Sequence, residues 1–239
     1  MKKLLSILRT RLILTGFLLA VAFLVMPVTA QAAGFSGSGS GTAADPYVIT
    51  TPEQLNEVRN NLSAHYRLGA DIDLSGYMSW QPIGSQSAPF TGSLDGGGFT
   101  IRNLSIDRSN DDIIGLFGSV NGASFQNVII KNGLVRGRYE TGGLVGRASN
   151  ASINGCSFSG SVFGYHTVGG LVGKSDGSNI QDSWASGYVT GDGFCIGGLI
   201  GACTINGGTI RNSHAQSQVT GGANAGGLIG DAQNNVNII

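Results

Sequence analysis

The segment Gly142-Gly143-Leu144-Val145-Gly146 returns unchanged as Gly169-Gly170-Leu171-Val172-Gly173, and Gly-Gly-Leu-Ile-Gly follows at 197–201 and 226–230. A divergent copy, Ile114-Gly115-Leu116-Phe117-Gly118, precedes them. The glycine before each leucine falls at 115, 143, 170, 198 and 227, so the copies are 28, 27, 28 and 29 residues apart. A period this constant indicates a repeat architecture in which each unit packs only on its neighbours.

A second element between these copies identifies the type of repeat. Ile153, Phe158 and Val162 are matched by Ile180, Ala185 and Val189, and again by Ile210, Ala215 and Val219. Small or apolar residues alternate with polar ones, which is typical of strands, and helix formers are rare. A unit of about 28 residues suits one coil of a parallel β-helix, whereas a β-propeller blade needs about 40 residues or more. The sequence therefore predicts an all-β fold, a β-solenoid of about five coils.

In that solenoid equivalent side chains should stack into ladders, with leucines in one and Val135, Val162, Val189 and Val219 in another. The glycines should permit bends and close approach of the backbone at the corners. The structural repeat positions are therefore Gly115, Leu116, Gly118, Gly143, Leu144, Gly146, Gly170, Leu171, Gly173, Gly198, Leu199, Gly201, Gly227, Leu228 and Gly230.

These copies resemble the GLUG motif, which is named for its Gly-Leu-any-Gly core. Upstream, Gly41-Thr42, Asp45-Pro46-Tyr47, Asp71 to Leu74 and Leu94-Asp95-Gly96 look like the leader that often precedes such repeats. The resemblance implies a bacterial secreted or surface-attached protein, often adhesin-like. The motif also occurs in the non-catalytic part of some metallopeptidases that cut immunoglobulin A. It brings no functional residues with it.

The N-terminal region indicates export. Basic residues at 2, 3, 9 and 11 precede an apolar run over 12–25, and Ala30-Gln31-Ala32 offers a small-residue cleavage site. We expect a signal peptide at 1–32 and no stable membrane span after its cleavage; a retained anchor is the alternative. A flexible linker should cover 33–44, and a small mixed α/β capping region with one helix should cover 45–112. GLUG-type coils should fill 113–239 and be incomplete at the C-terminus.

Composition and charge exclude several classes of protein. Glycine contributes 40 of 239 residues, against an average share of about 7%. Collagen is excluded because glycine does not recur at every third position, and disorder is disfavoured because aliphatic residues recur throughout. Without residues 1–32 the chain keeps ten of its fourteen cations and all fourteen anions, a net charge of −4. This balance argues against nucleic acid as a partner.

Three cysteines are a poor framework for disulfides, although export permits them. Cys156 aligns with Ser183 and Ser213 in the repeat, so it should be a small buried residue. Cys195 and Cys203 flank one glycine-rich segment, and whether they pair stays open.

The sequence contains few candidates for catalysis or metal binding. His65, His166 and His214 are not part of a His-Glu-x-x-His pattern. Asp71 and Asp73 open a segment like a calcium loop, but Pro82 stands where the loop needs a glutamate. The carboxylates nearest the repeats, including Asp107, Asp111, Asp112 and Glu140, have no arginine or lysine at matching repeat positions. We therefore predict no catalytic residues, no metal ligands and no cofactor.

The expected function is a non-catalytic extracellular or cell-surface scaffold with an adhesin-like binding or structural role. Tyr139, Tyr165, Trp184 and Tyr188 should project from its faces. The partner would be an extracellular protein or glycan, with end-to-end self-association through the last coil as a further expectation. The alternatives are a carbohydrate-active β-helix enzyme and the N-terminal, non-catalytic fragment of a larger secreted peptidase.

Overall fold

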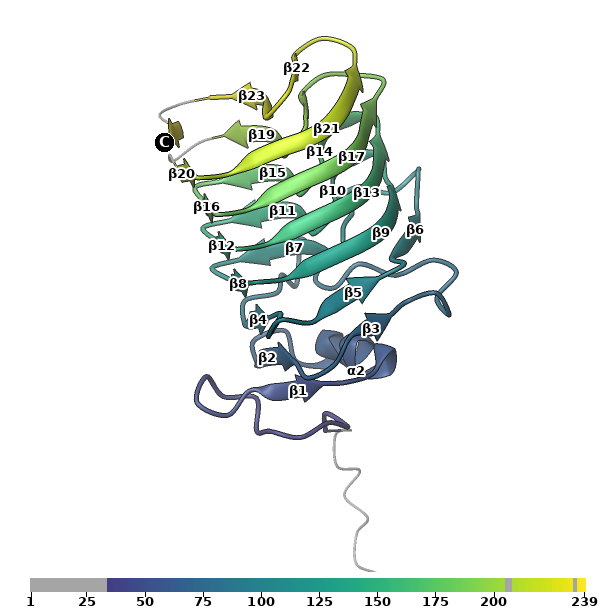
Figure 1. Ribbon diagram of the computed structural model, residues 1–239, viewed down its shortest axis with the longest axis vertical. Coiled ribbons are helices and arrows are strands. Elements are labelled where there is room, and N and C mark those ends of the chain that lie inside the picture. The colour runs from purple at the N-terminus through teal and green to yellow at the C-terminus, as the bar shows by residue number, and fades with distance from the viewer. Residues whose placement is uncertain (1–33, 205–207, 234–235) are drawn as a thin grey trace, which may run out of the picture. The chain divides into compact units, whose positions relative to one another are not determined.

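The computed structural model describes residues 34–204, 208–233 and 236–239; the predicted signal peptide at 1–32 lies outside the described residues. Within residues 35–239 the chain winds as a parallel β-solenoid of about six turns, which confirms the predicted fold class (Figure 1). Each strand pairs in parallel with the equivalent strands of the coils before and after it. Along many strands apolar residues alternate with polar ones. The apolar side chains then point into the solenoid, and the polar ones point toward solvent.

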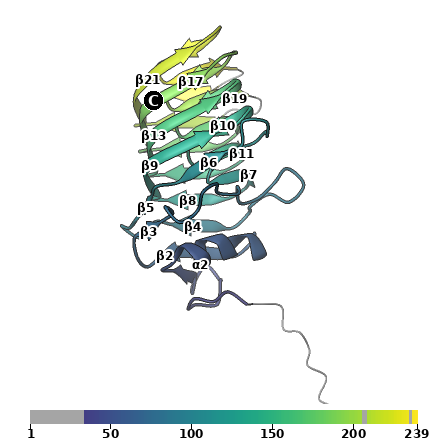
Figure 2. The same cartoon turned by 90° about the vertical axis from the view of Figure 1, so that its right-hand side faces the viewer.

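One complete coil runs through four sheets, which we call A, B, D and C in chain order. The chain passes from β8 (Ser124–Gln126, sheet A) to β9 (Ile129–Arg136, sheet B) and β10 (Tyr139–Gly142, sheet D). It continues through β11 (Val145–Ser149, sheet C) and returns to sheet A at β12 (Ser152–Asn154). Figure 2 shows sheet B along one side of the stack and sheet C along the other.

The other strands take equivalent places in the same four sheets. Sheet A also contains β1 (Tyr47–Ile49), β2 (His65–Leu68), β4 (Ser93–Asp95), β16 (Asn179–Gln181), β20 (Gly208–Arg211) and β24 (Val236–Ile238). Sheet B contains β3 (Ile72–Asp73), β5 (Thr100–Arg102), β13 (Ser157–Gly164), β17 (Trp184–Gly191) and β21 (His214–Gly221), and β6 (Ser105–Asp107) pairs with β9. Sheet C contains β7 (Phe117–Asn121), β15 (Val172–Asp176), β19 (Ile200–Thr204) and β23 (Ile229–Ala232), and sheet D contains β14 (His166–Gly169), β18 (Ile196–Gly197) and β22 (Ala225–Gly226).

The valine ladder forms as the sequence predicted. Val162 pairs in register with Val135 on one side and Val189 on the other, and Val189 pairs with Val219. The first three of these are 0–1% exposed, whereas Val219 is partly buried. The stacked aliphatic rows supply the hydrophobic core that holds the coils together.

Residues 45–112 are part of the solenoid as well as its cap. His65 of β2 pairs with Ser93 of β4, which lies 28 residues further on, so this region already has the period of the repeats. Ile83 and Phe90 then bridge to Phe117 and Val120 of β7. The extra winding explains why the structure has about six turns where the repeats alone predict about five.

The predicted helix is present next to β1. Helix α2 (Pro52–Glu57) continues as a 3₁₀ turn over Val58–Asn60. Thr51 accepts a hydrogen bond from the Gln54 backbone N–H, and the Gln54 side chain accepts one from the Thr51 N–H, so the capping box forms. Leu55 and Val58 are fully buried in the core. The helix therefore covers the first coil with apolar side chains.

The described part of the predicted linker at 33–44 is packed against the first coil. The Phe35 ring lies 4.6 Å from that of Tyr47 and 5.7 Å from that of Tyr66, measured between ring centroids. The Val48 N–H donates to the Ser38 carbonyl at 2.8 Å. One aromatic side chain thus packs this segment on the first coil, although its glycine and serine content is typical of a flexible linker.

Candidate functional site

The leucines and glycines of the repeated motif build the core rather than a binding surface. Leu116, Leu144, Leu171 and Leu199 are fully buried, while Leu228 in the last copy is partly buried. The motif glycines are needed for close packing between elements. A Cβ at Gly143 would overlap the Phe158 ring, and one at Gly170 would overlap the Gly198 carbonyl of the next coil. These glycines have no positive φ, so the bends lie elsewhere.

At the start of the sheet D segment, each coil has a left-handed residue that is not glycine. Ile113 has a φ of 63°, and the equivalent residues Glu140, Thr167, Cys195 and Asn224 have φ values of 53°, 57°, 64° and 57°. This conformation is uncommon for any residue but glycine, and for β-branched Ile113 and Thr167 it is strained. One strained corner thus recurs in five successive coils, and the candidate site lies beside it.

An aromatic column lies immediately before these corners. Tyr139 and His166 are in register, with their rings stacked at 5.4 Å, and His166 stacks on Phe194 at 3.8 Å. The Phe194 backbone N–H donates to His166 Nδ1 at 2.9 Å. Tyr165 flanks the column and is 45% exposed, and Phe194 is 52% exposed. The predicted projection of Tyr165 is therefore confirmed, whereas Tyr139 lies partly covered within the column.

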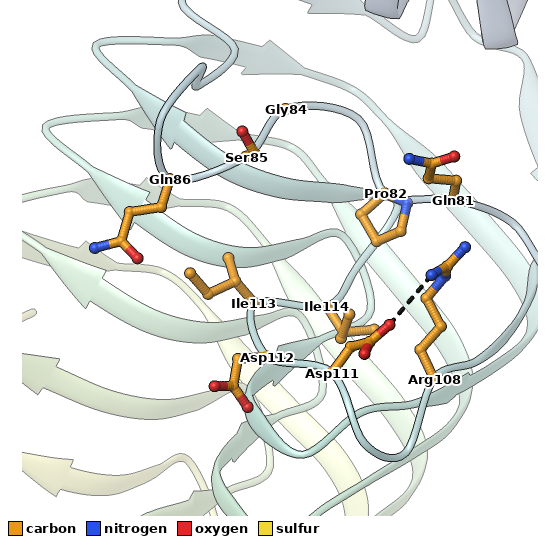
Figure 3. A pocket seen from close by; sticks show the side chains of 10 residues that line it. All are labelled: Gln81, Pro82, Gly84, Ser85, Gln86, Arg108, Asp111, Asp112, Ile113 and Ile114. Carbon is orange, nitrogen blue, oxygen red and sulfur yellow. Dashed lines mark hydrogen bonds and ion pairs between the residues drawn. The ribbon is translucent and has the colours of Figure 1, made fainter.

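Hollows open along the same edge of the solenoid. One of about 290 Å³ lies between the loop at 81–86 and the loop at 108–114, with Gln86 and Arg108 on opposite sides (Figure 3). A second, of about 370 Å³, shares Arg108 and Asp111 with it and reaches Ser109. A third, of about 200 Å³, extends from Ser109 to Tyr165 and Asp192. A fourth, of about 390 Å³, shares Gln81 and Ser85 with the first. We call this row of hollows, which share lining residues, the edge groove.

Three carboxylates of this region are paired with arginines. Arg138 binds Asp112 through Nε and Nη2 at 2.7 and 2.9 Å, and Arg147 binds Glu140 in the same way, with both distances 2.5 Å. Arg108 binds Asp111 through Nη1 at 3.2 Å. No arginine or lysine was expected at matching repeat positions, and these partners lie at other positions: Asp112 and Arg138 are 26 residues apart, and Glu140 and Arg147 are 7 apart.

The pKa of Asp112 argues against a role as catalytic acid. Hydrogen bonds from the Arg138 guanidinium hold this pKa below its usual range. A general acid in glycoside hydrolysis needs the opposite shift, so that it still carries a proton at neutral pH. The groove therefore offers Asp112 as a hydrogen-bond acceptor held in place by its arginine.

Arg108 differs from the other two arginines in how fully its donors are used. Arg138 and Arg147 each form two parallel hydrogen bonds to one carboxylate, the arrangement that satisfies the guanidinium best. Arg108 donates to Asp111 through a single nitrogen, and its Nε is buried with no hydrogen-bond partner among the described residues. The Arg108 guanidinium therefore keeps donor capacity that Asp111 does not use, although its buried Nε is out of reach of a ligand in the hollow.

The aspartates of the calcium-like segment connect neighbouring coils. Asp71 accepts hydrogen bonds from the Thr100 N–H and from Arg102 at 2.8 and 2.9 Å. Asp73 accepts from Ser75 and Asn103, both at 2.9 Å. Within the described ranges no group of three or more His, Cys, Asp or Glu side chains is arranged to hold a metal ion.

The cysteines occupy two kinds of environment. All are unpaired, so Cys195 and Cys203 form no disulfide. Cys156 and Cys203 are buried, and burial raises the pKa of each thiol to about 12. Cys195 is partly exposed, with its sulfur 3.8 Å from Asp231.

Of the residues that line this edge, the sequence alone indicated Tyr139, Tyr165 and the carboxylates. It missed Phe194, Arg108 and the loop at 81–86. A usable signal was present for the column, because positions 139, 166 and 194 are aromatic in three consecutive coils, one residue before the left-handed corner. No such signal exists for the loop, which lies outside the repeated motif.

Comparison with known proteins places the chain among repeat proteins. The family model "The GLUG motif" matches residues 137–162. The chain is 40% identical over 140 residues to Halomucin of Haloquadratum walsbyi, a match that covers 52% of this chain and 2% of Halomucin. It is 39% identical over 120 residues to a Gly-rich protein of Evansella cellulosilytica that is named as a candidate membrane protein; here 47% of this chain and 13% of the relative are covered.

A solved structure confirms the architecture. A candidate immunoglobulin A1 protease from Bacteroides ovatus superposes with a TM-score of 0.63 at 23% identity, covering 84% of this chain and 79% of the other. This likeness shows the fold alone. In the described ranges no helix has the length and apolar character to cross a membrane.

Proposed function

We propose that this chain, a repeat protein that carries the GLUG motif, is an exported, non-catalytic scaffold that acts at the cell surface or outside the cell. The local similarity to Halomucin and to a protein named as a Gly-rich membrane protein is the observation that carries this proposal, since these names fit a place at the cell surface. The chain spans only 2% and 13% of these relatives, so the similarity supports a location and an architecture rather than a complete activity.

The chemistry of the edge groove supports a scaffold over an enzyme. Asp111, Asp112 and Glu140 each accept hydrogen bonds from an arginine, and the pKa of Asp112 is lowered. The full sequence has no His-Glu-x-x-His pattern for a metal-dependent peptidase. In this proposal the solenoid is a rigid support that presents side chains from its edge and faces to a binding partner.

Export is tested by expressing the full chain with a C-terminal epitope tag in a bacterial host. We expect the tag in the medium or on the cell surface, accessible to added protease, and an intact mass that corresponds to cleavage after Ala32 or Ala33. A matched variant without residues 2–32 should stay in the cytoplasm. Cytoplasmic full-length material that still carries Met1 would contradict the proposal.

The non-catalytic part is tested separately. Purified mature chain should release no reducing ends from polysaccharides and should leave immunoglobulin A1 intact during long incubation. Turnover of either class of substrate that disappears in an Asp112→Asn variant would show that the chain is an enzyme.

A further inference from the structure

We propose that the edge groove is one elongated binding site for a neutral polysaccharide, which it holds along the axis of the solenoid. This inference rests on the proposed extracellular function and adds the class of ligand and the place where it binds. It depends on the length of the groove, its direction relative to the strands, and the chemistry of its lining.

The hollows follow one another over several coils and share lining residues. Gln81 and Ser85 line both of the hollows at its N-terminal end, Arg108 and Asp111 line both central ones, and Ser109 connects these with the hollow at Tyr165. The lining reaches from Asn60 beside the first coil to Asp192 between β17 and β18. Because successive coils are about 4.8 Å apart, five steps span roughly 24 Å. A ligand that fills this length is a polymer of several units.

The direction of the groove disfavours an extended peptide. A peptide usually binds to a sheet by adding a strand to an open edge, where backbone hydrogen bonds supply the affinity. Here the groove runs across the coils, and strands β9, β13 and β17 beside it are each paired on both sides with the neighbouring coils. A chain lying in the groove must therefore be recognised by side chains, which is how proteins bind sugar rings.

The lining suits a neutral sugar chain. Hydroxyl groups both donate and accept hydrogen bonds, and the groove provides acceptors at Asp111 and Asp192, a partly satisfied donor at Arg108, and an amide at Gln86. At its far end Tyr165 borders the hollow and offers a ring against which the C–H face of a sugar can pack, whereas the Phe163 ring is already covered by the Arg136 guanidinium at 5.1 Å from its centroid. The charged side chains of the lining nearly balance, so the groove holds no surplus of cations that would favour a polyanionic chain; they are Asp107, Asp111, Asp112 and Asp192 against Arg59, Arg108 and Arg136.

The experiment measures binding of the mature chain to soluble polysaccharides by affinity electrophoresis and calorimetry. The neutral probes are a β-1,3-glucan, a galactomannan, an α-mannan and a soluble starch, with polygalacturonate and heparin as charged probes and a random peptide library as a third class. We expect at least one neutral polysaccharide to bind, and the charged chains and peptides not to bind.

Two variants locate the site. Tyr165→Ala and Arg108→Gln should each weaken binding about tenfold, because they remove an aromatic platform and the incompletely paired donor. The matched control is Tyr188→Ala, since Tyr188 is 57% exposed on sheet B and does not line the groove. Melting temperatures within a few degrees of the parent chain show that each variant is folded.

Three outcomes would overturn the inference: no neutral polysaccharide binds, peptides or polyanions bind instead, or Tyr188→Ala weakens binding as much as the groove variants. Failure of the proposed function is distinguishable, because it shows in the location of the tagged chain. An exported chain that binds no neutral polysaccharide refutes the groove and leaves the scaffold intact.

Discussion

Thr141 stands in a column of the core where the next two coils have Val168 and Ile196. Its side chain is fully buried, and its hydroxyl has no hydrogen-bond partner within the described residues. A buried hydroxyl without a partner loses its hydrogen bonds to water on folding and forms none within the protein to replace them. We expect Thr141→Val to raise the free energy of unfolding by about 1 kcal/mol, measured by urea denaturation with an unchanged m-value.

The reverse change is the matched control. Val168→Thr places a hydroxyl at the equivalent position one coil further on, and it should lower the free energy of unfolding by about 1–3 kcal/mol. If Thr141→Val is destabilising, the Thr141 hydroxyl makes a favourable interaction and the column is not uniformly apolar.

The buried thiols predict how stability depends on alkaline pH. Burial raises the pKa of Cys156 to about 12, whereas an unfolded cysteine titrates near 8.5. The folded state therefore keeps a proton that the unfolded state loses. The stabilisation is complete below about pH 8.5 and is lost as the pH rises toward 12. We expect the free energy of unfolding to fall over this window, measured by denaturation at several pH values.

Cys156→Ser provides the comparison. The Cys156 N–H donates to the Ser183 hydroxyl at 3.1 Å, and the Ser183 N–H donates to the Ser213 hydroxyl at 3.2 Å, so serine already fills this position in the next two coils. The variant should fold and show a shallower alkaline slope. An unchanged slope would mean that the Cys156 thiol ionises in the folded and unfolded states at the same pH.

For single residues, the sequence predicts well which side chains are buried, but it predicts poorly which charged side chains form ion pairs. The alignment of Cys156 with two serines correctly placed it in the core, because stacked coils share one environment at each position. The pair between Arg138 and Asp112 could not be predicted from that alignment, because it joins different positions of neighbouring coils, 26 residues apart. Such pairs depend on the path of the chain around the corner, which the repeat pattern does not contain.

Among the elements, β17 tests which face of a strand is buried. Val189 is 1% exposed and pairs with valines on both sides, while the next residue, Thr190, is on the outer face beside Phe163 and Thr220. Val189→Asp places an unpaired charge in the core and should cost several kcal/mol, comparable with the stability of a whole domain. Thr190→Asp should change the melting temperature only slightly. Equal melting temperatures for the two variants would show that both faces are accessible.

The elements differ in how well they could be predicted. The capping box at Thr51 and the strands of the repeats follow from local patterns, and both are present. Strands β2 to β6 were assigned to a cap because their region has no Gly-Leu-any-Gly sequence, although it has the same period of 28 residues. The turn after Asp95 joins β4 and β5, which lie in different sheets, so it is a corner of the solenoid.

The corners show why the edge groove could not be predicted. Two other sets of left-handed positions are filled by residues such as Asn127, Gly155, Gly122 and Asn150, which adopt this conformation readily. The corner at Ile113, Glu140 and Thr167 is occupied by residues that do not favour it. Packing of the adjacent coils imposes the conformation there, and sequence propensity alone points to a strand.

The whole molecule is organised so that each coil contacts chiefly its neighbours. In such a stack, stability is approximately a sum of terms for each coil and for each interface between coils. A substitution that destabilises one coil should therefore destabilise mainly that coil and its immediate neighbours. This behaviour separates a solenoid from a globular domain of the same size, in which most contacts share one core.

Leu171→Ala and Leu55→Ala test this organisation from two places. Both leucines are fully buried, Leu171 in the coil of β15 and Leu55 in helix α2, and each change should cost about 2–5 kcal/mol. Hydrogen exchange measured by mass spectrometry should show lost protection mainly in β11, β15 and β19 for Leu171→Ala, and mainly in β1 and β2 for Leu55→Ala. Uniform loss over all coils in both variants would contradict nearest-neighbour stabilisation. If protection from exchange is lost only near the substitution, each part of the solenoid depends on its adjacent coils. The edge groove crosses several coils, so it would then keep its shape only while all of those coils remain folded.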